Sequence, residues 1–411
     1  MEIQDILIVR YGEIALKGMN KPYFEKTLLR RIRRACSPLI ITAETVDGLI
    51  IVRGYAPEDK EALARKILRV FGVATVSPAW ELPSREQGDI NAAAVAWMEG
   101  RLKEQRKESL PEGDPAKGGL PLTYKIFGKR SDKSWPLTSP ELAALAGEAV
   151  LEAYGEERVK VDVNNPEVRL HVHLRRKNVL IYDDMQKGFG GLPLGTNGKG
   201  LVLLSGGIDS PVSAWMMAKR GMLIEAVHFH SYPFTSKRAE EKVADLTEIL
   251  ASYCGRVRLH VLNLLPVQEA FAETCPEDEI VILTRRSMMR IAARVANREG
   301  CGFLITGENL GQVASQTAES MVVTDAASPL PVLRPLVALD KVDIIERAKE
   351  IGTYEVSILP YEDCCQVFVP KHPKTKPSLE EIEASEGLLG PARLAALEEE
   401  VLASEELHII G

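Results

Sequence analysis

The sequence predicts an α/β multidomain protein whose C-terminal half is a doubly wound parallel sheet. Beyond residue 200, short apolar segments alternate with longer helix-like segments, as in parallel strands joined by crossover helices. Before residue 180 the order of strands and helices is less regular, and a glycine-rich stretch at 188–195 separates the two patterns. A length of 411 residues with 45% hydrophobic content is enough for two or three globular domains.

The N-terminal half divides into two expected domains, at 1–60 and 61–180. The first reads as strand, basic helix and strand. Within the second, residues 101–119 are rich in Lys, Glu, Gly and Pro and are expected to form a mobile surface insertion. The expected strands are 6–9, 49–52, 122–127, 159–163 and 168–174, and the expected helices are 23–36, 62–71 and 140–154.

A linker is expected at 181–200, followed by a C-terminal domain over 201–411. Its expected strands are 201–204, 223–230, 258–264 and 303–306, and its expected helices are 210–220, 238–254, 278–298 and 311–319. The tail from 378 to 407 contains nine glutamates and one arginine in a helix-favouring composition. We interpret this tail as a solvated helical face without chemistry.

Composition and charge favour a cytoplasmic location. The N-terminus has no basic segment followed by a long apolar one, so no signal peptide is expected. The apolar runs are strand-sized and too short to cross a membrane. The six cysteines form no CxxC pair and no metal-ligand spacing, as is usual for reduced thiols in a cytosolic protein.

The segment from Leu203 to Pro211 predicts a phosphate-binding loop. An apolar strand leads into Ser205-Gly206-Gly207, and a helix is expected to begin at Ser210. Glycines allow backbone amides to approach phosphate closely, and a helix N-terminus adds free N–H donors. A capped glycine-rich turn would explain such a loop if it stood alone. Here the loop follows the first strand of a parallel sheet, where ligands bind.

Asp209 within this loop predicts a bound cation. A carboxylate beside bare phosphate would be repelled, so Asp209 implies Mg²⁺ between the carboxylate and a pyrophosphate group. The hydroxyls of Ser205 and Ser210 are further donors to phosphate. The chain contains no Walker A pattern. The spelling SGGxDS resembles the loop of the ATP pyrophosphatases (the PP-loop), which transfer AMP to a carbonyl or carboxylate oxygen.

Further motifs resemble those of the tRNA 4-thiouridine synthetases (tRNA sulfurtransferases). They occur in the order of that family at 10–20, 188–193, 227–230, 307–316, 333–336, 340–341 and 362–365. The resemblance covers nearly the whole chain. It implies an N-terminal ferredoxin-like domain, a THUMP RNA-binding domain and an ATP pyrophosphatase domain.

The resemblance also implies a set of ATP-binding residues. Besides the loop residues Ser205, Gly206, Gly207 and Ser210, these are Leu203, Leu204, His228, Phe229, Arg285, Gly307 and Gln316. Leu203, Leu204 and Phe229 are suited to flank adenine, and Arg285 to meet a phosphate as a fork donor. Lys341 matches a family lysine implicated in catalysis.

Two adjacent cysteines, Cys364 and Cys365, are the candidate sulfur carriers. A thiolate or persulfide sulfur must attack the carbon that bears AMP, and a thiol in a polar loop near Lys371 and His372 suits this role. Alignment to the family leaves a one-residue ambiguity, so the two compete. The other four cysteines lie on or beside expected helices and strands and are expected to serve packing.

Longer members of the family append a rhodanese-like domain, and this sequence resembles the short form. A cysteine desulfurase is then expected to hand its persulfide directly to the thiol segment. The resemblance also implies a sulfur-carrier protein of thiazole synthesis as a second recipient, in thiamine biosynthesis. The sequence allows a homodimer and does not decide it.

Basic residues cluster in the N-terminal half of a chain whose net charge is −7. Seven Lys or Arg fall between residues 17 and 34, and smaller clusters lie at 125–133 and 175–177. Cationic stripes of this kind follow a phosphate backbone, with salt-dependent affinity. The residues predicted to contact tRNA are Lys17, Lys26, Arg30, Arg33, Lys129 and Arg130.

The sequence therefore predicts an enzyme that adenylates O4 of uridine 8 in tRNA and replaces this oxygen with sulfur. ATP and Mg²⁺ are its expected cofactors, and Asp209, Lys341, Cys364 and Cys365 its expected catalytic residues. One alternative is an adenylating ligase acting on a small carboxylate, which the basic clusters disfavour. The other is a non-catalytic RNA-binding protein, which the intact loop disfavours.

Overall fold

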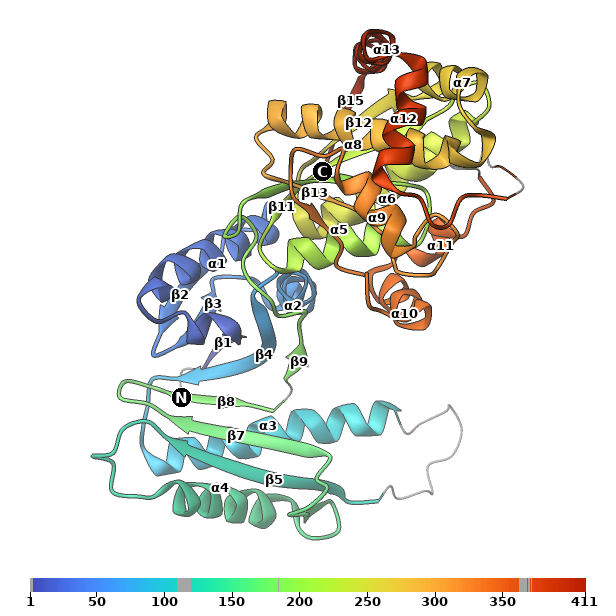
Figure 1. The fold of residues 1–411 in the computed structure, drawn as a ribbon. Helices are drawn as coiled ribbons and strands as arrows, with labels where there is room; N and C mark the ends of the chain where they lie inside the picture. Colours follow the sequence, from blue (N-terminus) through green and yellow to red (C-terminus); the bar gives the residue numbers. More distant parts are fainter. Residues whose placement is uncertain (1–2, 109–119, 184, 362–367, 369, 371) are drawn as a thin grey trace. The chain divides into compact units, whose positions relative to one another are not determined.

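A computed structural model describes residues 3–108, 120–183, 185–361, 368, 370 and 372–411. The chain divides into two compact units, Met1–Gly190 and Gly191–Gly411 (Figure 1). Each unit has its own sheet and its own buried core.

The first unit is built on one continuous sheet. Among its described residues, eight strands follow the order β2-β3-β1-β4-β8-β7-β5-β6, and a ninth strand, β9, pairs with β4. The strands are β1 Gln4–Tyr11, β2 Thr42–Val46, β3 Leu49–Arg53, β4 Val73–Leu82, β5 Leu122–Arg130, β6 Val159–Val161, β7 Val168–Leu174, β8 Val179–Tyr182 and β9 Gln186–Lys187. The helices are α1 Lys21–Cys36, α2 Lys60–Leu68, α3 Gln87–Glu108 and α4 Ser139–Tyr154.

Strand β4 joins the two halves of this sheet. Its residue Trp80 pairs with Asp5 of β1 on one side and with Ile181 of β8 on the other, both antiparallel. Helices α1 and α2 pack together over the β1 half, while α3 and α4 pack together beside the β5 half. The domain boundaries expected near residues 60 and 180 stay predictions, and the strands on either side of residue 60 belong to this one sheet.

The insertion expected at 101–119 is wrong for residues 101–108. Helix α3 continues to Glu108, and its Met98 and Leu102 are both buried in the core. These two side chains are one helical turn apart, so they face the same way and hold the helix on the sheet. The surrounding Lys and Glu residues hid this short apolar spacing. Residues 109–119 lie outside the described residues.

The second unit contains the expected parallel sheet. Its order is β14-β13-β10-β11-β12-β15, with parallel pairing except for β15, which pairs antiparallel with β12. The strands are β10 Lys199–Leu203, β11 Leu223–His230, β12 Val257–Asn263, β13 Phe303–Ile305, β14 Val332–Leu333 and β15 Glu406–Ile410. The helices are α5 Asp209–Lys219, α6 Lys237–Cys254, α7 Leu265–Thr274, α8 Ile280–Glu299, α9 Ala318–Asp325, α10 Lys341–Ile351, α11 Tyr354–Ser357, α12 Leu379–Leu389 and α13 Pro391–Ala403.

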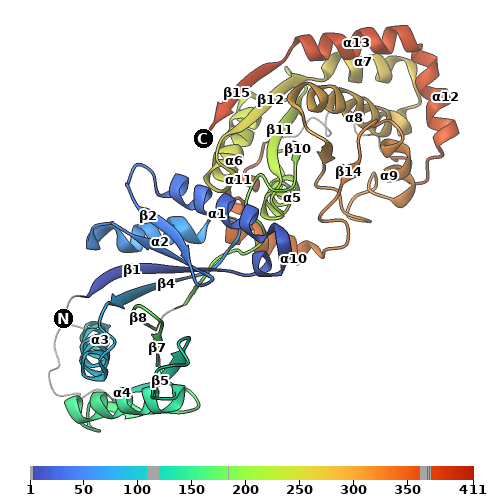
Figure 2. The same ribbon diagram turned by 90° about the vertical axis from the view of Figure 1, so that its left-hand side faces the viewer.

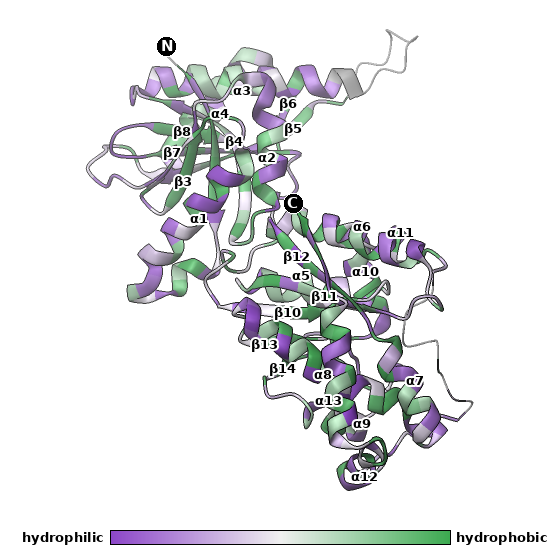
Figure 3. Ribbon diagram, turned by 90° about the horizontal axis from the view of Figure 1, so that it is seen from above, coloured by the Kyte–Doolittle hydropathy of each residue, from purple (hydrophilic) through white to green (hydrophobic). Residues whose placement is uncertain are grey.

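Helices cover both faces of this sheet, as the alternating pattern predicts (Figure 2). Helices α5, α6, α10 and α11 contact one another on one face, and α7, α8, α12 and α13 on the other. In Figure 3 these helices carry both hydrophilic and hydrophobic residues, as expected of elements with one buried side. The core includes Leu201, Val227 and Ala292, which are fully buried.

The helix expected at 311–319 is wrong. Residues up to Thr317 form a loop, and α9 begins at Ala318 with the Thr317 side chain accepting a hydrogen bond from the Ser320 amide. Gly311 has a φ of +73°, a left-handed conformation that interrupts a helix. The cap at Thr317 therefore marks the true beginning of the helix.

The acidic tail is also more than a solvated face. In α12 and α13, Ile382 and Val401 are fully buried in the core of the second unit. Glu386 contacts Arg286 and Arg290 of α8 with oxygen–nitrogen distances of 3.1 and 2.8 Å. The tail then adds β15 to the sheet. Its apolar residues recur at helical spacing, and the glutamates between them concealed this pattern.

Candidate functional site

The predicted phosphate loop joins the end of β10 to the beginning of α5. The Ser205 amide donates to Oγ of Ser210 at 2.9 Å, and the Gly207 amide lies 3.2 Å from Oγ of Ser205. The two serine hydroxyls lie 3.2 Å apart. These bonds fold the loop tightly over the first turn of α5, whose backbone amides at this end can receive an anion.

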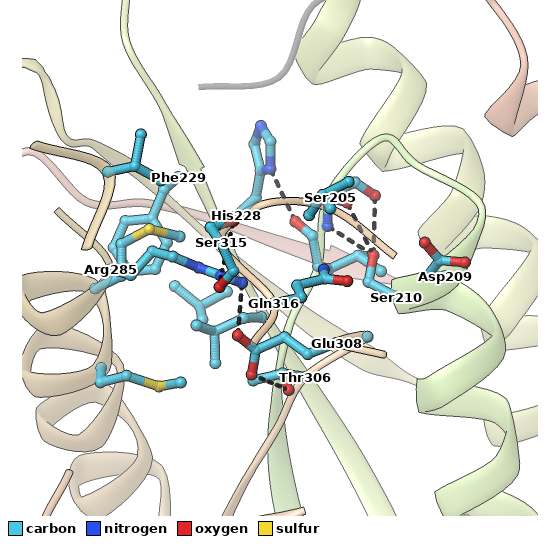
Figure 4. A pocket seen from close by; sticks show the side chains of 18 residues that line it. Ser205, Asp209, Ser210, His228, Phe229, Arg285, Thr306, Glu308, Ser315 and Gln316 are labelled. Carbon is cyan, nitrogen blue, oxygen red and sulfur yellow. Dashed lines mark hydrogen bonds and ion pairs between the residues drawn. The ribbon is translucent and has the colours of Figure 1, made fainter. Parts of the chain in front are cut away.

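A cavity of about 250 Å³ lies at the carboxyl ends of β10, β11 and β13 (Figure 4). Strand β10 is flanked in the sheet by β11, the next strand in the chain, on one side and by β13 on the other. This is the topological switch point at which open parallel sheets bind ligands. Its lining includes nine residues of the predicted ATP set: Leu203, Leu204, Ser205, Ser210, His228, Phe229, Arg285, Gly307 and Gln316.

The remaining two residues of that set, Gly206 and Gly207, lie in the loop beside this lining. On the α8 side, Val281 and Met288 form an apolar wall, and Phe229 belongs to the β11 side. His228 is buried, with its Nδ1 2.9 Å from the Leu204 carbonyl oxygen. The structure thus brings the predicted nucleotide residues together, and their individual roles stay predictions.

The two predicted catalytic residues outside the thiol segment form an ion pair. Nζ of Lys341 lies 2.5 Å from Oδ1 of Asp209, and the Gln312 side-chain amide donates to Oδ2 at 2.8 Å. Asp209 is the first residue of α5, so its carboxylate lies at the positive end of the helix dipole. Lys341 and Gln312 thus keep the Asp209 carboxylate oriented at the edge of the cavity.

Gly307 allows the end of β13 to approach the phosphate loop. A Cβ atom at this position would lie 2.7 Å from the Ser210 nitrogen and 2.9 Å from the Asp209 carbonyl carbon. Because those neighbours are backbone atoms, they cannot turn aside as a side chain can. A glycine is therefore required for the close contact between this strand end and α5.

A buried ion-pair chain lies beside the cavity. Glu308 is 3% exposed and contacts Arg285 at 2.6 Å and Arg334 at 2.7 Å. Burial raises the pKa of the Glu308 carboxyl, but the two guanidinium groups outweigh burial and hold this pKa below its ordinary value. Glu308 is therefore ionised at neutral pH.

Several residues of the site were absent from the predicted set. Glu308, Gln312 and Ser315 fall inside the family motif at 307–316, and Arg334 falls in the motif at 333–336, so the sequence did contain a signal for them. Ser357 had no such signal. Its hydroxyl lies 3.3 Å from the Gly207 carbonyl oxygen and supports the phosphate loop from α11.

The basic residues predicted to contact tRNA lie in the first unit. On α1, Lys26, Arg30 and Arg33 are exposed, and Nη2 of Arg33 donates to the Ala43 carbonyl at 2.5 Å. Lys17 precedes α1, with its Nζ 5.0 Å from the centre of the Phe24 ring. Exposure of this helix face fits a phosphate-binding stripe.

The other two basic clusters are less open. Lys129 is exposed, but Arg130 uses Nη1 to bond the carbonyl oxygens of Trp135 and Leu137 at 2.7 and 2.8 Å. Arg175 is 2% exposed and contacts Asp47 at 2.6 Å. The interpretation of 175–177 as a surface cluster is therefore wrong for Arg175, because its charge is paired inside the fold.

Cys364 and Cys365 lie outside the described residues, so their placement is not part of the site geometry. Of the other cysteines, Cys36, Cys254 and Cys301 are buried, which confirms a packing role. Burial raises the pKa of Cys36 to about 11 and that of Cys301 to about 12. Such thiols are poor nucleophiles at neutral pH.

No helix in the described part of the chain is long and apolar enough to cross a membrane.

Three family models match the chain in order. "ThiI ferredoxin-like domain" matches residues 6–77, "THUMP domain" matches 89–184 and "Thiamine biosynthesis protein (ThiI)" matches 195–389. This confirms the expected sequence of ferredoxin-like, THUMP and PP-loop folds.

Curated relatives match over almost their full length. A probable tRNA sulfurtransferase of Alkaliphilus metalliredigens is 48% identical over 388 residues, which is 94% of each chain. One of Alkaliphilus oremlandii is 47% identical over 408 residues, which is 99% of this chain and 100% of that one.

Among solved structures, a 4-thiouridine synthetase–RNA complex with bound ATP is similar with a TM-score of 0.86. It is 36% identical, and the match covers 99% of this chain and 100% of that chain. PH1313 from Pyrococcus horikoshii is similar with a TM-score of 0.64 at 25% identity, over 85% of this chain and 99% of that chain.

Proposed function

The chain belongs to the tRNA sulfurtransferase family, and we propose that it uses ATP to replace O4 of uridine 8 in tRNA with sulfur. The observation that best supports this proposal is the cavity at the switch point of the second sheet. Residues of the phosphate loop and of the predicted ATP set line this cavity. A similar protein binds both RNA and ATP in its crystal structure.

The first step is adenylation. The phosphate loop and the start of α5 hold the phosphates of ATP by backbone amides, and the apolar wall from α8 accommodates the nucleoside. Uridine O4 forms a bond to the α-phosphorus while the bond from this phosphorus to the bridging oxygen breaks. Pyrophosphate leaves, and in this proposal Lys341 neutralises charge on the α-phosphate.

The donor set beside the loop fits Mg²⁺. Asp209 has a partly exposed carboxylate at the cavity edge, held by Lys341 and Gln312, whereas the carboxylate of Glu308 is buried between two arginines. One carboxylate together with phosphate oxygens and water is a usual environment for this ion. When bound there, Mg²⁺ supplies charge neutralisation of the phosphates.

The second step is sulfur transfer, carried by Cys364 or Cys365. The terminal sulfur of a cysteine persulfide forms a bond to C4, and the bond from C4 to the AMP oxygen breaks. A second thiol then attacks the remaining S–S bond, which releases 4-thiouridine and leaves a disulfide for a thiol reductant to reduce.

The proposed partners follow from this chemistry. A cysteine desulfurase supplies the persulfide, and tRNA binds through the exposed basic face of α1 in the ferredoxin-like region. The name of the matching model, "Thiamine biosynthesis protein (ThiI)", supports a second role in thiamine biosynthesis, for which we propose a sulfur-carrier protein of thiazole synthesis as the recipient. We propose a cytoplasmic location. We also propose a possible homodimer, for which size-exclusion chromatography is the test.

The experiment is nucleoside analysis of tRNA incubated with the protein, ATP, Mg²⁺, cysteine and a desulfurase. We expect 4-thiouridine, and we expect none when ATP or the protein is omitted. A tRNA whose uridine 8 is replaced by cytidine is the matched control. Absence of 4-thiouridine together with ATP-dependent adenylation of a small carboxylate would instead support a ligase.

A further inference from the structure

Glu308 joins two arginines at the base of the nucleotide cavity. Its Oε1 lies 2.6 Å from Nη2 of Arg285, and its Oε2 lies 2.7 Å from Nε of Arg334. The Thr306 hydroxyl donates to Oε2 at 3.0 Å. Glu308 also immediately follows Gly307, which packs against the phosphate loop.

This carboxylate connects segments that are far apart in sequence. Arg285 extends from α8 toward Glu308 and Ser315, and its Nη1 donates to the Ser315 carbonyl at 3.0 Å (Figure 4). Arg334 in turn contacts the carboxylate of Asp325 in α9, with nitrogen–oxygen distances of 2.5 and 2.9 Å. The ion pairs therefore fix α8, the loop before α9, and the ends of β13 and β14 around one buried group.

The charges of these four ion-paired side chains balance. Two guanidinium groups are matched by two carboxylates, so the Arg285 side of the cavity offers little net attraction to an anion. The start of α5, which follows the loop from Ser205 to Ser210, offers the positive end of a helix dipole instead. An Arg285 freed from Glu308 would create a second anion site in the same cavity and compete for the triphosphate.

We propose that Glu308 is a positioning residue for ATP, which holds Arg285 in place and compensates its charge so that the triphosphate binds only at the phosphate loop. The nucleoside then lies beside Arg285 and the α8 wall. This assignment rests on the proposed ATP-dependent function. It also revises the expectation that Arg285 is a fork donor to phosphate, because both of its terminal nitrogens already have protein partners.

The test is Glu308→Gln, which keeps the size of the side chain and removes its charge. Binding is measured by calorimetry with two probes, α,β-methylene-ATP and pyrophosphate. We expect the Kd for the ATP analogue to rise by up to about 100-fold, the scale of a misplaced positioning group. We expect the Kd for pyrophosphate to fall, because Arg285, which lines the cavity, becomes available to it.

Glu386→Gln is the matched control. Glu386 also joins two arginines of α8, Arg286 and Arg290, but neither Glu386 nor these arginines belong to the cavity lining. Its loss is expected to lower the Tm and leave both Kd values unchanged. A merely structural role for Glu308 would give this same result.

Glu308→Asp decides the matter if the glutamine variant does not fold. Aspartate keeps the charge but is one methylene too short to hold both guanidinium groups, so an intermediate Kd for the ATP analogue is expected, with the wild-type Kd for pyrophosphate. Wild-type affinity for both probes in the folded variants would overturn the assignment. A wild-type protein that fails to bind the ATP analogue would refute the proposed function itself.

Discussion

Lys341 and Asp209 form an ion pair between the first residues of two helices, although they are 132 positions apart in the chain. A lysine at a helix N-terminus faces the positive end of the dipole, which disfavours it. The carboxylate of Asp209 offsets this cost and keeps the ammonium group at the edge of the cavity. The pair thus makes Asp209 responsible for both the loop and the position of Lys341.

Asp209→Ala is expected to abolish pyrophosphate release while leaving the Kd for tRNA nearly unchanged. In the proposed reaction the carboxylate serves the phosphates, the cation and Lys341, and it has no proposed role toward RNA. Pyrophosphate release is measured with tRNA and ATP, and tRNA binding by filter retention. Asp343→Ala, which removes another exposed acid of α10, is the control and should behave like the wild type. Full pyrophosphate release from a folded Asp209→Ala protein would remove the assignment.

Gly307→Ala is expected to impair ATP binding and to lower stability. The added methyl group would lie 2.7 Å from the Ser210 nitrogen, so the end of β13 and the start of α5 must move apart. Overpacking of this kind costs about 1–3 kcal/mol. Thermal denaturation with and without ATP measures both effects. Gly302→Ala, where a Cβ meets nothing within 4 Å, should change neither.

Replacement of Lys26 and Arg30 together by Ala is expected to weaken tRNA binding and flatten its salt dependence. Each lost phosphate contact reduces the slope of log K against log salt by roughly one unit. Titrations at several salt concentrations give the slope. Arg65→Ala, at an exposed position of α2, is the control. If the slope stays unchanged in the double variant, this face of α1 does not contact phosphate.

Cys365→Ser is expected to stop 4-thiouridine formation and to leave tRNA-dependent pyrophosphate release intact. Adenylation needs no thiol, whereas displacement of AMP requires transferable sulfur. We expect Cys364→Ser to retain some activity, and Cys275→Ser, which affects a half-buried thiol, to behave like the wild type. A protein with serine at both 364 and 365 that still forms 4-thiouridine would exclude these thiols as carriers.

Alkylation of the native protein by iodoacetamide at pH 8 is expected to spare Cys36 and Cys301. Burial raises the pKa of these thiols to about 11 and about 12. At pH 8 a thiol with a pKa near 11 is only about 0.1% thiolate, and this fraction rises as the pH increases. Peptide mass spectrometry identifies the labelled positions. Rapid labelling of either cysteine in folded protein would contradict its burial.

Much of the second unit could be predicted because its strands and helices follow the rules of parallel sheets. The expected strand 223–230 has the bounds of β11, and helix 238–254 differs from α6 by one residue. One helix of this unit was predicted in the wrong place and another, α7, was not predicted, for opposite reasons. Polar residues and Gly311 form the loop before α9, where composition favoured a helix, whereas α7 follows β12 so closely that its beginning was not separated from the strand.

The site was predictable where residues are local in sequence and hidden where charges pair over long distances. The loop from Ser205 to Ser210 follows directly from its strand and helix. The partners of Glu308 lie 23 and 26 positions away in opposite directions, so no local pattern joins them. Burial of Arg175 depends on Asp47, which belongs to another part of the sheet. Such pairings become visible only once the chain is folded.

The uninterrupted sheet of the first unit has a mechanical consequence. Its ferredoxin-like and THUMP regions share the hydrogen bonds between β4 and β8, so neither can swing against the other unless that ladder breaks. The stretch that matches the ferredoxin-like model ends at residue 77, inside β4. Cleavage at this residue would expose strand edges with unpaired backbone groups, which are prone to aggregation. The basic face of α1 and the exposed Lys129 are consequently held at a set spacing. We infer that this unit binds tRNA as one rigid body, with its basic residues at fixed distances from one another.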